Sequence, residues 1–304
     1  FKDMNTSFVS FKKAVLYSLQ LYPLMLAELI LGNIAIILLS KSHTIETVGI
    51  FKILFNYYLV LKFIPEFFGR VIGPTLTKLY FDKDLPKIEI YYNFTFKMSI
   101  LLCSLISIFF IGFIKNLLGI YNVYGSEYVY GMFILLGSNL VLTGSMIGGI
   151  YQAYNKPKFI SLFVGLGSFT NFCLSIILIP KYGIIGACVS ILSSNIISQI
   201  GLHYFALKKM KIDIVIKKFF QSLVLVLSLG SMIILSSNYN NSLLIKSLII
   251  MMMIVIYLIS LKFFRFFSSE ELMQLLLYFD NSENKFMKLI ASYFRRISSN
   301  INCN

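Results

Sequence analysis

The residues best suited to chemistry in this sequence are charged and amide side chains within an apolar segment, residues 46–69. On an α-helix, at 100° per residue, Lys52, Asn56, Glu66 and Arg70 share a face, and Lys62 lies beside them. Glu66 is four residues from both Lys62 and Arg70, a spacing that allows ion pairs along the helix. A charge at the centre of a membrane costs roughly 2.5–3.5 kcal/mol and therefore faces protein or water. The pattern predicts a hydrated, net-cationic cavity that binds an anionic head group.

Two further charges belong to the same set of candidates. Glu28 stands alone in the apolar segment 15–39, where it could be protonated and couple transport to ion movement, and Lys97 lies near the start of the segment 91–114. A structural interpretation competes with the cavity for some of these residues. Lys52, Arg70 and Lys97 lie near segment ends, where long cations extend to the membrane interface. Apolar segments also contain amides that can hydrogen-bond across helices, namely Asn139, Asn171, Asn195 and Gln199.

Enzyme chemistry has no support in the sequence. It contains no GxxxxGK[ST] phosphate loop, no HExxH and no GxSxG motif. It has no CxxC pair and only two histidines, His43 and His203, so we expect no catalytic residue, no cofactor and no metal. A membrane-embedded polysaccharide polymerase or ligase stays open as a second hypothesis. Such enzymes need a large outer loop with catalytic Arg or His, whereas the expected outer loops are short.

Composition sets the fold class. Of the 304 residues, 58% are hydrophobic and 13% are charged, against about 25% charged in a soluble domain. We therefore expect an all-α integral membrane protein, a polytopic helical bundle. The net charge of +14 does not indicate nucleic-acid binding, because no basic helix or stacking platform accompanies it.

The apolar runs predict about eight transmembrane helices and a single orientation. The expected spans are 15–39, 46–69, 91–114, 127–150, 159–180, 183–206, 217–236 and 243–264. Alternating the loops places 20 Lys and Arg residues on one side and 4 on the other. By the positive-inside rule we expect an inner-membrane, multi-pass protein with its C-terminus in the cytoplasm. The longest loop is expected near residues 70–90, and the tail after Arg265 is expected to form amphipathic helices on the membrane surface.

The segment 171–188 predicts two antiparallel membrane helices joined by a very tight turn. Pro180 and Gly183 end one apolar run, and Gly186-Ala187 begin the next. This segment resembles the "N…LN..LIP.YG..GAA" signature of the polysaccharide transporter family, the Wzx-type flippases of lipid-linked oligosaccharide. Further matches follow in order over about residues 20–210, including Val48-Gly49-Ile50-Phe51 and Gly125-Ser126-Glu127-Tyr128. The chain departs from the family at Asn33-Ile34, where members often carry Asp-Arg.

The resemblance implies the multidrug/oligosaccharidyl-lipid/polysaccharide exporter fold, in which two six-helix lobes surround a central cavity. Residues 1–210 would then be the second lobe, residues 211–264 two additional peripheral helices, and residues 265–304 a cytoplasmic amphipathic tail. The first lobe is expected upstream of Phe1.

It also implies translocation of undecaprenyl-diphosphate-linked oligosaccharide for O-antigen, lipopolysaccharide or capsule assembly, by alternating access and not by an enzymatic reaction. The partners would be lipid-linked oligosaccharide, membrane lipids, a polysaccharide polymerase and a chain-length regulator. A multidrug antiporter of the same superfamily and a purely structural membrane subunit also stay open as hypotheses.

Overall fold

The computed structural model describes residues 33–210, 216–236, 243–264 and 266–267, together with residues 15, 18, 19 and 22. The chain divides into two compact units, residues 1–254 and residues 255–304. In the second unit the described residues are the end of one helix and the few residues after it. Glu28 and the predicted amphipathic tail beyond residue 267 fall outside the described residues.

Every regular element in the described ranges is helical. After a helical stretch, Asn33–Ser42, the elements are α2 (Ile45–Phe81), α3 (Leu85–Gly119), α4 (Ser126–Leu142), α5 (Ile147–Ala153), α6 (Pro157–Phe205), α7 (Ile216–Ser236) and α8 (Leu243–Phe263). A 3₁₀ turn, η1 (Thr143–Met146), joins α4 to α5, and a π-helical segment, η2 (Ala206–Met210), follows α6. Six of the described helical segments are long and apolar enough to cross a membrane. The prediction of a polytopic helical membrane protein is confirmed.

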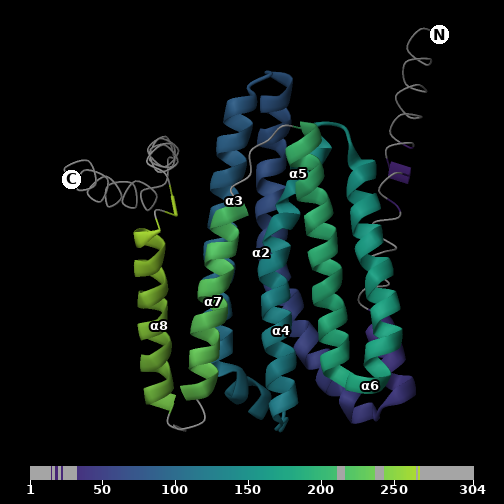
Figure 1. Cartoon of the computed structure of the whole chain (residues 1–304), viewed down its shortest axis with the longest axis vertical. Helices are drawn as coiled ribbons and strands as arrows, with labels where there is room; N and C mark the ends of the chain where they lie inside the picture. Colours follow the sequence, from purple (N-terminus) through teal and green to yellow (C-terminus); the bar gives the residue numbers. More distant parts are fainter. Residues whose placement is uncertain are drawn as a thin grey trace. The chain divides into compact units, whose positions relative to one another are not determined.

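The tight turn predicted near residue 180 lies at Gly183. Its backbone angles, φ 54° and ψ −126°, leave the helical region and reverse the direction of α6. We call residues 157–182 the first limb of α6 and residues 184–205 the second limb; they run antiparallel (Figure 1). With α6 counted as two spans, the described helices match seven of the eight predicted spans. The first predicted span, 15–39, is described continuously only from Asn33.

The long loop expected near residues 70–90 is wrong. α2 continues to Phe81 and α3 begins at Leu85, so only three residues connect the two helices. With 37 residues at 1.5 Å each, α2 is about 55 Å long, well beyond the ~30 Å membrane core. The α2–α3 hairpin reaches beyond the ends of α5 and α6 (Figure 1). Hydropathy marks where an apolar run ends, and it misses a helix that continues into water.

The α2–α3 turn is made by local backbone chemistry. Lys83 adopts φ 57°, and the amide of Asp84 donates to the carbonyl of Leu79 at 3.0 Å, which is the pattern of a Schellman cap. Asp84 then accepts from the amide of Lys87 and starts α3. α3 and α5 end in the same way, with Asn122 at φ 55° and Asn155 at φ 53°.

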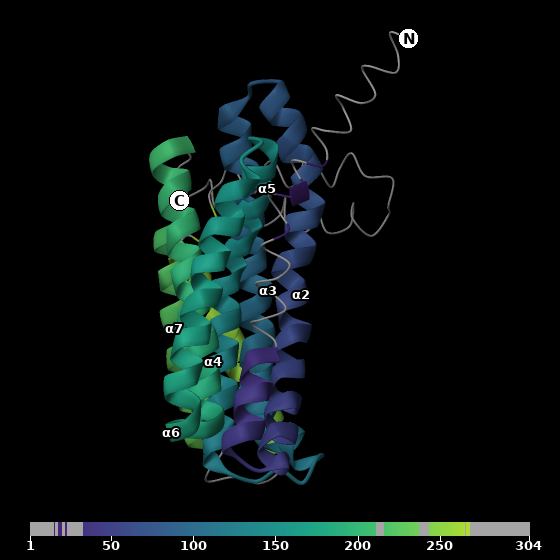
Figure 2. The same cartoon turned by 90° about the vertical axis from the view of Figure 1, so that its right-hand side faces the viewer.

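Within the first unit, α4 packs against α2 and α6, and α3 packs against α2 and α7 (Figures 1 and 2). Hydrogen bonds between polar side chains support these contacts, as between the hydroxyls of Ser104 on α3 and Ser222 on α7 at 3.1 Å. The α2–α3 and α5–α6 turns lie at one end of the helices, and the reversal inside α6 lies at the opposite end (Figure 1). This alternation agrees with the loop alternation used for the charge count.

Candidate functional site

The predicted polar stripe lies on α2, on the side away from the packed core. Thr44 caps α2 by accepting a hydrogen bond from the amide of Thr47, and the helix is continuous through Pro65 and Pro74. Core residues of α2, including Phe51 and Leu54, are buried against neighbouring helices. Lys52, Asn56 and Arg70 are exposed, and Lys62 and Glu66 are half-buried. The helix therefore gathers all five candidate residues of this segment on the side away from the described core.

Glu66 joins two cations along this stripe. Its Oε1 atom lies 3.2 Å from Nζ of Lys62, and its Oε2 atom lies 3.9 Å from an Nη atom of Arg70. Both pairs have the i, i+4 spacing that the sequence suggested. Because one carboxylate meets two cations, the triad keeps a net charge of about +1 and can attract a further anion.

A buried polar network fixes α2 from the opposite side. The Asn195 amide donates to the Tyr58 hydroxyl at 3.0 Å and to the Ser138 hydroxyl at 2.6 Å. The amide of Asn139 donates to the carbonyl oxygen of Tyr58 at 3.0 Å. These bonds tie α2 to α4 and to the second limb of α6. The sequence marked Asn139 and Asn195 as buried amides but gave no sign of Tyr58, which stands in an apolar run like any core aromatic.

One candidate within the described residues does not join this exposed stripe. Lys97 lies on α3 and is 4% exposed, so it is inside the helical packing. Its neighbour Phe96 faces the rings of His203 on α6 and Phe219 on α7. Glu28 lies outside the described residues, so its predicted role stays a prediction.

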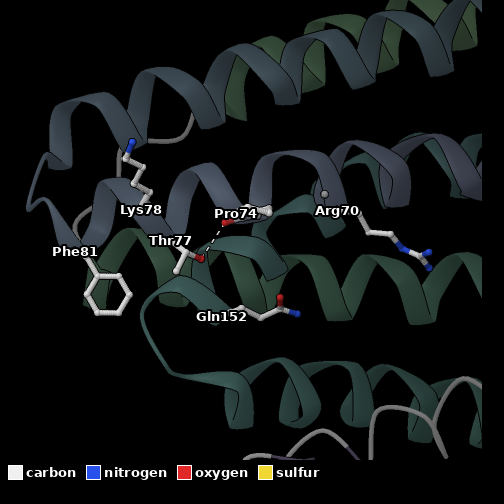
Figure 3. Close-up of a pocket in the computed structure, with 8 residues that line it drawn as sticks. Arg70, Pro74, Thr77, Lys78, Phe81 and Gln152 are labelled. Carbon is white, nitrogen blue, oxygen red and sulfur yellow. Dashed lines mark hydrogen bonds between the residues drawn. The ribbon is translucent and has the colours of Figure 1, made fainter.

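A groove between α2 and α5 adjoins the Arg70 end of the stripe (Figure 3). Its volume is about 660 Å³, and its lining is Gly69, Arg70, Gly73, Pro74, Thr77, Lys78, Phe81 and Gln152. In Figure 3, Arg70 and Phe81 leave α2 toward the side on which Gln152 lies, and Lys78 leaves it on the opposite side. The Thr77 hydroxyl donates to the carbonyl of Gly73 at 2.9 Å.

The sequence did not predict this groove. Its floor exists because Gly69 and Gly73 have no side chains and because α5 approaches closely at Gly149. The signal in the sequence was two glycines four residues apart on the charged helix, a spacing that allows helices to approach closely. Gln152 comes from a different helix, and its proximity could not be read from spacing.

Comparisons with known proteins identify the fold. No protein-family profile matches the chain. A solved outward-facing multidrug resistance MATE family transporter of the MOP superfamily superposes with a TM-score of 0.60 at 18% identity, covering 73% of this chain and 52% of that chain. The chain has the fold of this transporter. It is a multi-pass helical membrane protein.

A sequence relative is also known. The capsular polysaccharide biosynthesis protein CapF of Staphylococcus aureus is 31% identical over 174 residues, which cover 52% of this chain and 41% of the relative. The chain thus spans less than half the length of this relative and about half of the solved transporter.

Proposed function

We propose that this chain is part of an exporter that moves lipid-linked oligosaccharide across the membrane during polysaccharide biosynthesis. The cationic stripe on α2 carries this proposal, because a membrane helix tolerates such charges only where they meet water, protein or an anionic ligand. The MATE-type fold supports a transporter, and the similarity to a capsular polysaccharide biosynthesis protein supports a carbohydrate cargo.

In this proposal the stripe holds the diphosphate, or acidic sugars, of an undecaprenyl-diphosphate-linked repeat unit. Lys52, Lys62 and Arg70 provide the positive charge, and Glu66 keeps the two cations nearest to it in place. The lipid tail stays in the bilayer while two lobes alternate in access, as inverted-repeat transporters do. Residues 1–210 form the second lobe, and residues 211–264 add two peripheral helices.

The remaining features are proposed on the same basis. The protein resides in the bacterial inner membrane with its C-terminus in the cytoplasm, because this orientation follows the Lys and Arg distribution. It works with a polysaccharide polymerase and a chain-length regulator, and it carries out no enzymatic reaction. O-antigen, other lipopolysaccharide and capsule are all products consistent with this role.

A cell-based measurement tests the proposal. Cells lacking the full reading frame should accumulate undecaprenyl-linked repeat units on the cytoplasmic side, and the wild-type gene should relieve this. The Lys62→Met variant should relieve the accumulation poorly. Lys41→Gln removes an exposed lysine that precedes α2 and should relieve the accumulation fully. Normal surface polysaccharide without accumulation would contradict the proposal.

A multidrug antiporter is the second candidate, favoured by the identity of the solved transporter with the same fold. Its cargoes would be cationic drugs, which a net-cationic stripe repels. Drug susceptibility of the same deletion strain separates the two functions. Increased drug sensitivity with normal polysaccharide would place the antiporter first.

A further inference from the structure

We propose that the groove between α2 and α5 binds the phosphate head group of a membrane lipid. This site differs from the central stripe, although Arg70 lies where the two meet. The inference does not depend on export activity. It rests on the position of the groove relative to the membrane, on the groups that line it, and on the space in it.

The length of α2 places the Arg70 end of the groove at the level of the lipid head groups. α2 begins at Ile45, so about 20 residues, enough for the ~30 Å core, end near residue 66. The head-group layer adds roughly 5–8 Å, which at 1.5 Å per residue places Gly69 and Arg70 within it and Gly73 at its aqueous edge, about 10 Å past residue 66. The neighbouring span begins at Ser126, and Gln152 lies about 10 Å past its first 20 residues, which is also the aqueous edge of the head-group layer. Arg70 therefore lies at the depth of lipid phosphates, and Gln152 on the other wall lies at the aqueous edge of the same layer.

Arg70 supplies the charge that a phosphate needs. Its guanidinium presents several donors in one plane, a geometry that matches two phosphate oxygens. The Arg70 side chain is 81% exposed, and its contact with Glu66 is 3.9 Å, longer than the 3.2 Å contact of Lys62 with the same carboxylate. Glu66 is therefore held more closely by Lys62, and Arg70 is available to a second anion.

The other lining groups suit a head group better than a bare ion. Gln152 carries amide donors on the opposite wall, on the side toward which Arg70 extends (Figure 3). The Thr77 hydroxyl gives its proton to the Gly73 carbonyl, so its oxygen is free to accept from a glycerol or sugar hydroxyl. Phe81 adds an apolar surface at the far end.

The space in the groove can be closed without disturbing the packing. A Cβ atom at Gly73 would meet no heavy atom within 4 Å, and the same is true of Gly49 near the other end of α2. We therefore expect Gly73→Leu to reduce the space in the groove, and Gly49→Leu is its matched control on the same helix. Replacing a helical glycine by leucine favours the helix, so both variants should fold.

Binding to the purified full-length protein in detergent tests the site. Farnesyl diphosphate, dioctanoyl phosphatidylglycerol and sodium pyrophosphate are titrated separately by calorimetry. We expect Arg70→Gln to weaken lipid binding about tenfold, because it removes a charge-assisted bidentate contact. Gly73→Leu should weaken lipid binding about as much, because its side chain occupies space that the head group needs. Arg70→Lys should be intermediate. Gly49→Leu and Lys83→Gln, which removes an exposed cation near the same end, should stay within twofold of wild type.

The probes also identify the source of the phosphate. Groove-dependent binding of farnesyl diphosphate alone supports a polyisoprenyl diphosphate ligand, and equal binding of phosphatidylglycerol supports a bulk membrane lipid. The proposal is overturned if the groove variants bind both lipids as wild type does, or if pyrophosphate alone binds as tightly as the lipids. Groove-dependent binding in a protein whose deletion leaves polysaccharide export normal would uphold the site and reject the proposed function.

Discussion

The Nε2 atom of His43 lies 2.9 Å from the carbonyl oxygen of Ile179, a residue 136 positions away in the sequence. Ile179 is buried, and four residues later Gly183 leaves the helical conformation, so this carbonyl lies where the first limb of α6 ends. The Nε2–H group of His43 donates to it and caps the limb. His43 also packs 3.5 Å from the position of a Cβ at Gly183. A histidine with no assigned role in the sequence thus supports the most recognisable turn of the chain.

Removing this cap should destabilise the protein. His43→Ala leaves a buried carbonyl without its donor, which we expect to cost about 1–3 kcal/mol. His43→Gln keeps a side-chain donor and should recover part of the loss. Thermal unfolding in detergent measures both variants. Equal unfolding temperatures for His43→Ala and wild type would contradict the capping role.

The turn at Gly183 also needs the two limbs of α6 to approach closely at Gly186. A Cβ atom there would collide with the backbone carbonyl of Leu178, which cannot move aside as a flexible side chain can. Gly186→Ala should therefore destabilise the protein by about 1–3 kcal/mol. Gly137→Ala is the control, because a Cβ at Gly137 meets nothing within 4 Å. The control should be neutral or stabilising by up to about 1 kcal/mol, and chemical unfolding in detergent compares the two.

Replacing Lys83 by glycine should make the protein more stable. A non-glycine residue at φ 57° carries a steric cost that glycine does not, and the Lys83 side chain is exposed. Lys83→Gly should stabilise the α2–α3 turn by about 0.5–1 kcal/mol, seen as a higher unfolding temperature. Asp82→Gly, at an ordinary helical φ of −73°, should not stabilise. A lower unfolding temperature for Lys83→Gly would show that the side chain contributes more than its backbone strain costs.

The hydrogen bonds that Asn195 donates to Tyr58 and Ser138 should stabilise the protein cooperatively. Asn195→Ala removes the donor to both Tyr58 and Ser138, and we expect a loss of about 1–2 kcal/mol. Tyr58→Phe removes one acceptor and should cost about 0.5 kcal/mol. Hydrogen bonds between membrane helices average roughly 0.6 kcal/mol in double-mutant cycles, so the cycle for Tyr58 and Asn195 should give a coupling of that size. Additive losses would mean that the two side chains do not interact in the membrane.

Much of the fold follows from the sequence alone. Length of apolar run fixes which segments can cross a membrane, and Pro180 with Gly183 fixes the reversal inside α6. Helical periodicity was enough to place Lys52, Asn56, Glu66 and Arg70 on one side of α2, because 100° per residue is a local rule. The same local rule predicted the contacts of Glu66 with Lys62 and Arg70.

The tertiary structure decided what depends on neighbours distant in sequence. It buried Lys97 inside the packing and placed Gln152 across a groove from Arg70. It brought His43 to the carbonyl of Ile179 and extended α2 and α3 past the apolar runs. Hydropathy and periodicity describe one segment at a time, whereas burial, capping and grooves arise where helices far apart in the chain meet. The sequence by itself determined which segments can cross a membrane and which faces are polar, and only packing determined how far the helices extend and what those faces meet.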